Sequence, residues 1–265
     1  MANDTVKDHY KDIAAQYDGL EALPHSRLAQ ELVQYALGDC TGQVILDVGG
    51  GSGLHARNAI ANGAARVDNI DLSQEMLHNC DAAEEREGRK PGERVVCFAG
   101  DATRPLDHLA LPGRSDSRGL YDVVMVIWTF DHASSISELE GMWRNVAQHC
   151  RPHGKVVSIR ITNPWESHQR VMKYGVKVSD MQTVSGGVKY IYTVMADPPF
   201  SCEATAMEAH YDLNRARAMA KKFGFGDLEV VPTAEMPVIK ENREFWQDFL
   251  DHPSFCCVAG VKEGT

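Results

Sequence analysis

Short apolar runs recur along the chain, separated by longer segments of mixed polarity. Runs of this length, rich in Val and Ile and bounded by turn residues, predict buried strands. The five in the first part of the sequence are 44–48, 67–71, 95–102, 121–130 and 151–159. Further along, 213–224 predicts a helix ended by a glycine, and 228–231 and 255–261 predict two closing strands. Alternation of strands and helical segments predicts an α/β fold in which helices cover both faces of a central sheet.

The first predicted strand runs into a glycine-rich turn. Asp47 is followed by Gly49, Gly51 and Gly53, and glycine both allows a sharp turn and lets a ligand approach the backbone. A dinucleotide loop spaces its glycines as G-x-G-x-x-G, whereas here the third glycine comes one residue early. No Lys-Ser or Lys-Thr pair follows, as a triphosphate loop requires. Asp47 would repel a pyrophosphate and attract an ammonium group. The turn alone leaves dinucleotide binding, a different nucleotide-like cofactor and a structural turn as alternatives.

Acidic residues at the ends of the next two strands narrow these alternatives. Asp71 ends the second strand, twenty positions after Gly51. An acid at this spacing hydrogen-bonds ribose hydroxyls in such sheets. Asp101 ends the third strand and is followed by Ala102.

Five segments, in the same order along the chain, resemble the class I S-adenosylmethionine-dependent methyltransferases. D-x-G-x-G-x-G at 47–53 resembles motif I, and 71–77 resembles the family's D-x-S-x-x-M-L pattern. Asp-Ala at 101–102, the fourth strand at 121–130 and the Arg-Pro-His-Gly turn at 151–154 complete the set, with Arg and His replacing Lys and the first Gly of K-P-G-G.

This resemblance implies a doubly wound, Rossmann-like, seven-stranded sheet that binds S-adenosyl-L-methionine and releases S-adenosyl-L-homocysteine. Asp101 would then accept a hydrogen bond from the adenine amino group, and the Ala102 backbone N–H would face the ring. The cofactor-binding residues that the resemblance implies in the central part of the chain are Asp47, Gly49, Gly51, Gly53, Asp71, Leu72, Met76, Asp101, Ala102 and Ile127.

An amphipathic helix is predicted before the first strand. Tyr10, Ile13, Ala14 and Tyr17 have the spacing of one helix face, so the helix either packs on the sheet or covers the cofactor. The string Y-x-x-I-A-x-x-Y-D resembles the opening of small-molecule methyltransferases, in which this helix is a lid over the methionine end of the cofactor. Tyr17 and Arg27 are the candidate contacts there.

The chain is predicted to be one methyltransferase domain, 1–265, with four parts. Lid helices would occupy 1–40, the cofactor-binding half 41–162, an acceptor-site insertion 163–212, and the closing helix and strands 213–265. Loops beyond the carboxyl ends of the strands carry ligand sites in such sheets. An insertion after the fifth strand is therefore well placed to cover a substrate.

The candidate acceptor site is aromatic. Trp128, Phe130, Trp165 and Tyr174 are candidate walls for a flat or heterocyclic acceptor, and each is as compatible with core packing. His132 follows the fourth strand, where it would be either a general base for an acceptor hydroxyl or ammonium or a loop residue that caps or packs.

The strings at 131–133 and 173–176 resemble the small-molecule group that includes the toxoflavin-pathway methyltransferase. This resemblance implies methyl transfer to N, O or S of a small, secondary-metabolite type of acceptor. A nonmethylating cyclase or isomerase that retains the cofactor is one alternative, and a nucleic-acid amino-methyltransferase is another. Asp197-Pro198-Pro199-Phe200 matches the D-P-P-[YFW] string of the latter class, but it follows the strand-like segment 188–195 and not the fourth strand, so we predict a turn.

Composition limits the partners and the location. A net charge of −10 offers no overall basic footprint for nucleic acid, and the longest apolar run, 123–128, is too short to span a bilayer. The seven cysteines form no C-x-x-C pair, which favours reduced thiols and a cytoplasmic location. There is no H-E-x-x-H motif, so no metal is predicted. The oligomeric state stays open.

Overall fold

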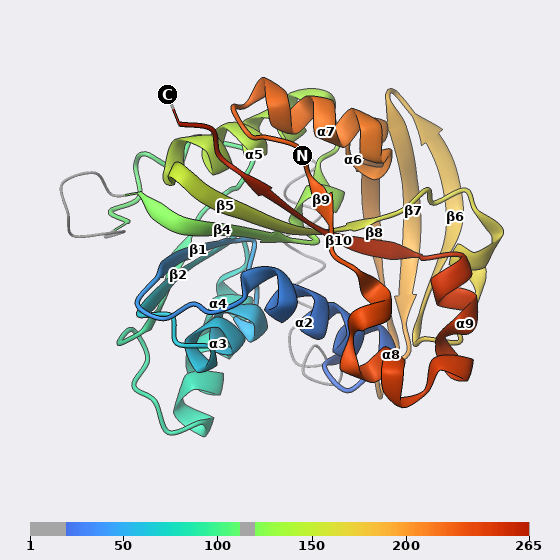
Figure 1. Ribbon diagram of the computed structural model, residues 1–265, viewed down its shortest axis with the longest axis horizontal. Coiled ribbons are helices and arrows are strands. Elements are labelled where there is room, and N and C mark those ends of the chain that lie inside the picture. Colours follow the sequence, from blue (N-terminus) through green and yellow to red (C-terminus); the bar gives the residue numbers. More distant parts are fainter. Residues whose placement is uncertain (1–19, 112–119, 265) are drawn as a thin grey trace.

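A central seven-stranded sheet organises the protein (Figure 1). The computed structural model describes residues 20–111 and 120–264. In spatial order the strands are β3 (Val95–Ala99), β2 (Arg66–Asp71), β1 (Val44–Val48), β4 (Tyr121–Ile127), β5 (Cys150–Ile161), β10 (Phe255–Val261) and β9 (Glu229–Val230). The first five are parallel, and β10 runs antiparallel to both of its neighbours. The predicted α/β fold with a doubly wound, seven-stranded sheet is confirmed.

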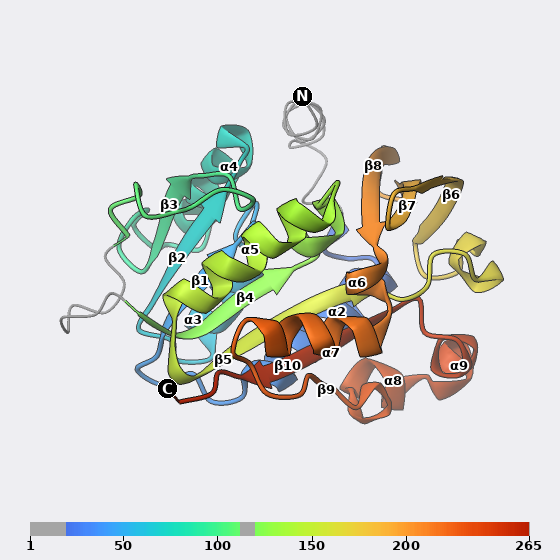
Figure 2. The same ribbon diagram turned by 90° about the horizontal axis from the view of Figure 1, so that it is seen from above.

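Helices cover both faces of this sheet, which explains why its strands read as continuous apolar runs. One face carries α2 (Pro24–Leu37), α3 (Leu54–Ala61), α8 (Pro237–Glu241) and α9 (Arg243–Asp251). The other carries α5 (Ile136–His149), α6 (Glu208–Tyr211) and α7 (Leu213–Lys222) (Figure 2). α4 (Gln74–Arg86) packs against β2 and β3.

Alternate residues of each strand enter opposite core clusters. On β4, Val123, Met125 and Ile127 face the cluster under α2, whereas Val124 and Val126 face the cluster under α5. All five are buried, so a single strand contributes to both layers of the core. Because β1 pairs in parallel with both β2 and β4, the carboxyl ends of these strands lie at one edge of the sheet, where the turn after β1 begins.

A second, smaller sheet follows β5. It consists of β6 (Val176–Val184), β7 (Gly187–Val194) and β8 (Phe200–Met207), all antiparallel, and the short helix η3 (Ser167–Arg170) precedes it. β8 packs against η2 (Thr129–His132), the turn that follows β4. Ile161 at the end of β5 packs into the core of this sheet. The small sheet therefore stands over the carboxyl ends of the central strands (Figure 1).

The elements differ from the predicted ones in detail. The strand predicted at 228–231 is only two residues long, Glu229–Val230, while β5 begins at Cys150 and includes the turn-like 151–154 segment. Residues 197–199 link β7 to β8. The D-P-P string is thus separated from β4, as its position in the sequence predicted.

Candidate active site

The turn after β1 has a backbone that only glycine adopts easily. Gly49, Gly51 and Gly53 have φ values of 72°, 55° and 75°, in the left-handed region that side chains disfavour. Gly50 is excluded from substitution for a different reason: a Cβ there would overlap the Asn69 amide oxygen and the Asp47 carboxylate. Side chains are absent along this stretch, so the backbone is open to a ligand.

Asp47 lies buried directly beneath the turn. It is 0% exposed, and neither of its carboxylate oxygens has a hydrogen-bond partner within the described part of the chain; the same holds for the Asn69 amide oxygen. Burial, followed by the nearby charge of Asp71, raises the pKa of Asp47 to about 7. Buried acceptors are normally satisfied, so these three oxygens fit a site that is completed by a cationic or hydrogen-bonding ligand.

Asp71, at the end of β2, joins the turn to the next helix. Its carboxylate accepts the Gly51 N–H at 2.9 Å and the Ser73 N–H at 2.8 Å. Burial raises its pKa to about 6, and these backbone donors oppose the rise. Leu72 follows it and is half-buried, and Met76 is buried and packs beneath Gly51.

Asp101 and Ala102 shape the loop after β3. One Asp101 oxygen accepts the Thr103 N–H at 2.9 Å and its hydroxyl at 2.7 Å, and the Ala102 carbonyl accepts from the Asn145 amide at 2.8 Å. The structure therefore holds this loop rigidly from both sides.

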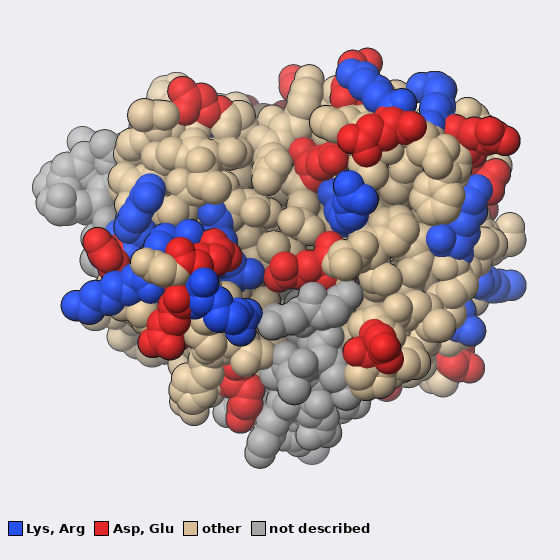
Figure 3. Space-filling view, turned by 90° about the horizontal axis from the view of Figure 1, so that it is seen from below, with Lys and Arg blue, Asp and Glu red and all other residues tan. Residues whose placement is uncertain are grey.

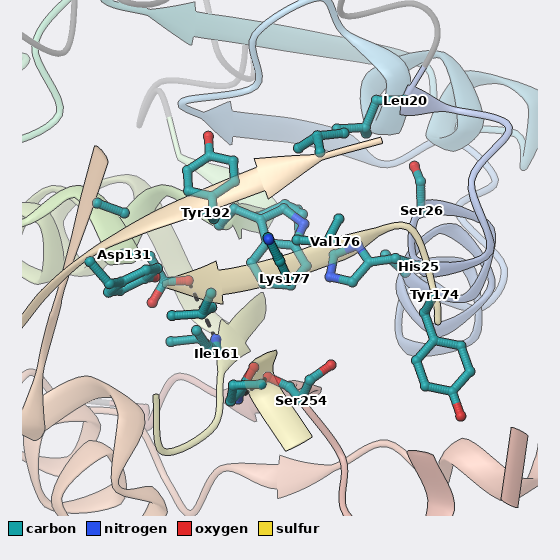
Figure 4. Close-up of a pocket in the computed structure, with 18 of the residues that line it drawn as sticks. Leu20, His25, Ser26, Asp131, Ile161, Tyr174, Val176, Lys177, Tyr192 and Ser254 are labelled. Carbon is teal, nitrogen blue, oxygen red and sulfur yellow. Dashed lines mark hydrogen bonds between the residues drawn. The ribbon is translucent and has the colours of Figure 1, made fainter. Parts of the chain in front are cut away.

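A cavity of about 520 Å³ extends from the glycine turn to the small sheet. Among the predicted residues, those that line it are Gly49, Gly51, Ile127, Trp128, His132 and Tyr174. Tyr190 and Tyr192 of β7 line the far side. In the close-up of Figure 4, Asp131 and Tyr192 lie on one side of the cavity, and His25 and Tyr174 lie on the other. Mostly apolar walls with a few polar groups are typical of a small-molecule site.

Three other predicted residues, two of the aromatic candidates and Arg27, lie away from the cavity wall. Phe130 is 0% exposed and stacks on Trp143 at 4.8 Å, because η2 turns Trp128 toward the cavity and Phe130 into the core. Trp165 is 42% exposed and Arg27 is exposed, and neither contributes to the cavity wall. Tyr17 lies outside the described residues.

Four histidines that the sequence left unassigned also line the cavity. They are His25, His55, His168 and His252. Burial lowers the pKa of His25 and of His55 to about 4, and His25 stacks on Trp128 with ring centroids 5.1 Å apart. At neutral pH these two imidazoles are uncharged and offer both a donor and an acceptor. The four histidines are far apart in sequence, so no local pattern could have shown that they line the same cavity.

His132 also lies on the cavity wall. Burial lowers its pKa, and the neighbouring Asp131 carboxylate opposes this effect. The ring is thus poised to be neutral near pH 7, as a proton acceptor must be. Its role as a base stays a prediction.

Within 20–111 and 120–264, no three His, Cys, Asp or Glu side chains are grouped as metal ligands would be. None of the helices in these ranges is long and apolar enough to cross a membrane.

Residues 45–154 match the family model described as a methyltransferase domain, and no curated protein sequence matches the chain. The CcbJ methyltransferase from Streptomyces caelestis is similar in structure, with a TM-score of 0.63 and 14% identity over 98% of each chain.

Two further solved structures share the fold. One is an S-adenosylmethionine-dependent methyltransferase from Clostridium acetobutylicum, with a TM-score of 0.60 and 15% identity over 96% of this chain and 99% of that one. The other is CalS10, an amino pentose methyltransferase from Micromonospora echinaspora, with a TM-score of 0.53 and 17% identity over 94% and 95%. The protein thus has the fold of the solved S-adenosylmethionine-dependent methyltransferases, and its residues 45–154 are similar to the methyltransferase-domain family.

Proposed function

We propose that the protein transfers a methyl group from S-adenosylmethionine to a nucleophilic N, O or S atom of a small, secondary-metabolite type of acceptor. The observation that carries this proposal is the cavity that begins at the glycine turn and ends at the small sheet. The solved structures that resemble the protein include CalS10, which is described as an amino pentose methyltransferase. A volume of about 520 Å³ lies in the range of small-molecule sites.

The cofactor would occupy the end of the cavity at the glycine turn. The open backbone of Gly49 and Gly51, together with the unsatisfied oxygens of Asp47 and Asn69, suits this group. Asp71 would accept from the ribose, and Asp101 from the adenine amino group. The sulfonium of S-adenosylmethionine supplies an activated methyl group. The protein therefore contributes by binding and orienting the two reactants and by excluding water.

Asp71→Ala is expected to lower the affinity for S-adenosylmethionine by between about 10-fold and about 150-fold, since a hydrogen bond to a charged group is worth about 1.5–3 kcal/mol. The loss arises at the ribose and at the Gly51 N–H, which the carboxylate fixes. Isothermal titration calorimetry measures it, and Asp107→Asn, an exposed acid on the loop after β3, is the matched control. An unchanged affinity in Asp71→Ala would contradict the ribose assignment.

The acceptor would lie against Trp128 and Tyr174, beneath the insertion that we propose to span 163–212. The lid at 1–40, the cofactor-binding half at 41–162 and the closing part at 213–265 complete the proposed single domain. The aromatic and imidazole walls of this end suit a flat or heterocyclic acceptor. A cytoplasmic location is consistent with the seven cysteines, which are all free thiols.

A nucleic-acid acceptor is disfavoured. Residues 197–199 link β7 to β8, and Phe200 is the first residue of β8, away from the end of β4 where such a motif acts. On the face drawn in Figure 3, Lys and Arg side chains lie among Asp and Glu, and broad areas carry neither. Interspersed charge of this kind provides no continuous track for a phosphate backbone.

Incubation of the protein with a metabolite extract and methyl-labelled S-adenosylmethionine tests the proposal. We expect a labelled product, with mass spectrometry showing the gain of one methylene over its precursor. A new product formed without this mass gain would identify a cyclase or isomerase instead. No product in extracts that support a known methyltransferase control would contradict the proposed activity.

A further inference from the structure

Three charged or titratable side chains are buried together behind the cavity wall. Asp131 of η2 is 4% exposed, Arg160 of β5 is 1% exposed and His210 of α6 is 3% exposed. Charged groups are almost never this deeply buried unless they are paired. Neither Arg160 nor His210 has a place in the proposed cofactor site.

Asp131 is the centre of this cluster. One of its carboxylate oxygens lies 3.3 Å from His210 Nε2, and the other accepts the backbone N–H of Ile161 at 3.4 Å. Burial lowers the pKa of His210, so a neutral imidazole faces the carboxylate at this distance, although the described residues form no hydrogen bond between the two atoms.

Arg160 faces the same region but is not hydrogen-bonded. Within the described part of the chain, none of its three side-chain nitrogens has a hydrogen-bond partner. Burial lowers its pKa, and Cys256, Asp131 and Asp212 oppose this effect. Guanidinium remains charged in proteins and the Cys256 thiol has a raised pKa, so Asp131 and Asp212 are the acids whose charge favours ionised Arg160, although neither forms a direct ion pair with it in the described part of the chain.

Asp131 also lines the cavity, beside Ile161 (Figure 4). It lies three residues after Trp128, in the η2 turn that follows β4. The other cavity acid, Asp248, is neutralised by Lys173 at 2.8 Å. Lys177 lines the same cavity, but within residues 20–111 and 120–264 Asp131 forms no ion pair with a lysine, and the buried Arg160 acts on it through charge.

We propose that Asp131 is a catalytic residue that binds an N–H or O–H of the acceptor and takes its proton, and that Arg160 and His210 are positioning residues for it. This inference rests on the proposed function. The acceptor N–H or O–H bond breaks, its electron pair stays on the acceptor atom that becomes methylated, and the proton moves to an Asp131 oxygen. The negative charge of Asp131 is lost as the positive charge of the methyl donor is lost, so the cavity gains no net charge.

The first test replaces Asp131 with Asn and measures methyl transfer with the extract fraction that is labelled in the screen above. We expect a loss of about 100-fold in turnover, the usual size of a general-base contribution, with the affinity for S-adenosylmethionine changed less than twofold in calorimetry. Asp107→Asn again serves as the exposed-acid control. If Asp131→Asn retains more than a third of the turnover, or if His132→Gln causes the larger loss, the inference is wrong. Failure of the screen itself, with no labelled fraction, would instead overturn the proposed function.

The second test does not use activity. Asp131→Asn leaves Arg160 without one of its anions, and Arg160→Met leaves Asp131 without its cation, so we expect each single variant to melt at a lower temperature than the double variant. Breaking a buried pair costs more than replacing both partners. The double variant also serves the activity test if Asp131→Asn does not fold, with the same expected loss. A double variant that melts below both single variants would contradict the pairing.

A pH profile separates positioning from simple stability. The groups around Asp131 are His132, Arg160, His210 and Cys256. We expect Arg160→Met to change the pH dependence of transfer, because the buried cation near Asp131 is gone, and Arg160→Lys to restore the wild-type profile. Coincident profiles for wild type and Arg160→Met would show that Arg160 does not act through Asp131.

Discussion

Gly50→Ala is expected to lower the affinity for S-adenosylmethionine by between about fivefold and about 100-fold, the range that corresponds to an overpacking cost of about 1–3 kcal/mol. The added Cβ would overlap the Asn69 amide and the Asp47 carboxylate. The turn is tied from below by Gly49 and Gly50 N–H groups, which both donate to the Ile70 carbonyl, at 2.7 Å and 3.2 Å. It can relieve the overlap only by moving into the space that the cofactor would occupy. Calorimetry measures the affinity.

Gly226→Ala is the matched control for this substitution. Gly226 has no left-handed φ, and a Cβ there would meet only the Val261 carbonyl, at an ordinary contact distance of 3.6 Å. We expect its affinity to equal that of the wild type. Equal affinities for Gly50→Ala and Gly226→Ala would show that the turn does not form the cofactor site.

The affinity for S-adenosylmethionine is expected to fall as the pH is lowered from 8 to 5, by up to about tenfold for each unit below 7. Asp47 has its pKa raised to about 7 by burial and by Asp71. A cationic ligand favours the ionised carboxyl group and lowers this pKa, so binding is strongest above pH 7 and must expel a proton below it. Asp71, with its pKa raised to about 6 by burial, adds a second loss below pH 6. Calorimetry in two buffers of different ionisation enthalpy measures both the affinity and the proton release.

Asp47→Asn is expected to bind more weakly at pH 8 and to lose the pH dependence between 8 and 6. Asp39→Asn, which removes an exposed acid before β1, should keep the wild-type dependence. A wild-type affinity that is constant from pH 8 to 6 would contradict the assignment of Asp47 to the cationic part of the cofactor.

The fold and the geometry of the turn after β1 were predictable because their signals are local. A parallel strand buried on both faces leaves a continuous apolar run, and a turn with left-handed φ values requires glycines at fixed positions. Asp47 and Asp71 could be placed for the same reason: each ends a strand, and parallel strands end at one edge of a sheet. The positions of Gly49 and Gly51 on the cavity wall agree with this reasoning.

The acceptor end was not predictable to the same extent because it is assembled from distant segments. His25 precedes β1 and His252 follows α9, yet both line the same cavity. Phe130 was a candidate wall, but the direction of a side chain in a short 3₁₀ turn cannot be obtained from spacing alone. Arg160 did leave a signal, a charged residue between two isoleucines in the mostly apolar second half of β5, which indicates a buried ionic group but not its partner.

The separate hydrogen bonding of the two sheets has a consequence for how specificity can change. The small sheet forms its ladders among β6, β7 and β8, so substitutions at Tyr190 or Tyr192 alter the far wall of the cavity without entering the ladder that carries the glycine turn. Under the proposed function, new acceptors can therefore be explored, by natural variation or by directed evolution, in a module separate from the proposed methyl-donor site.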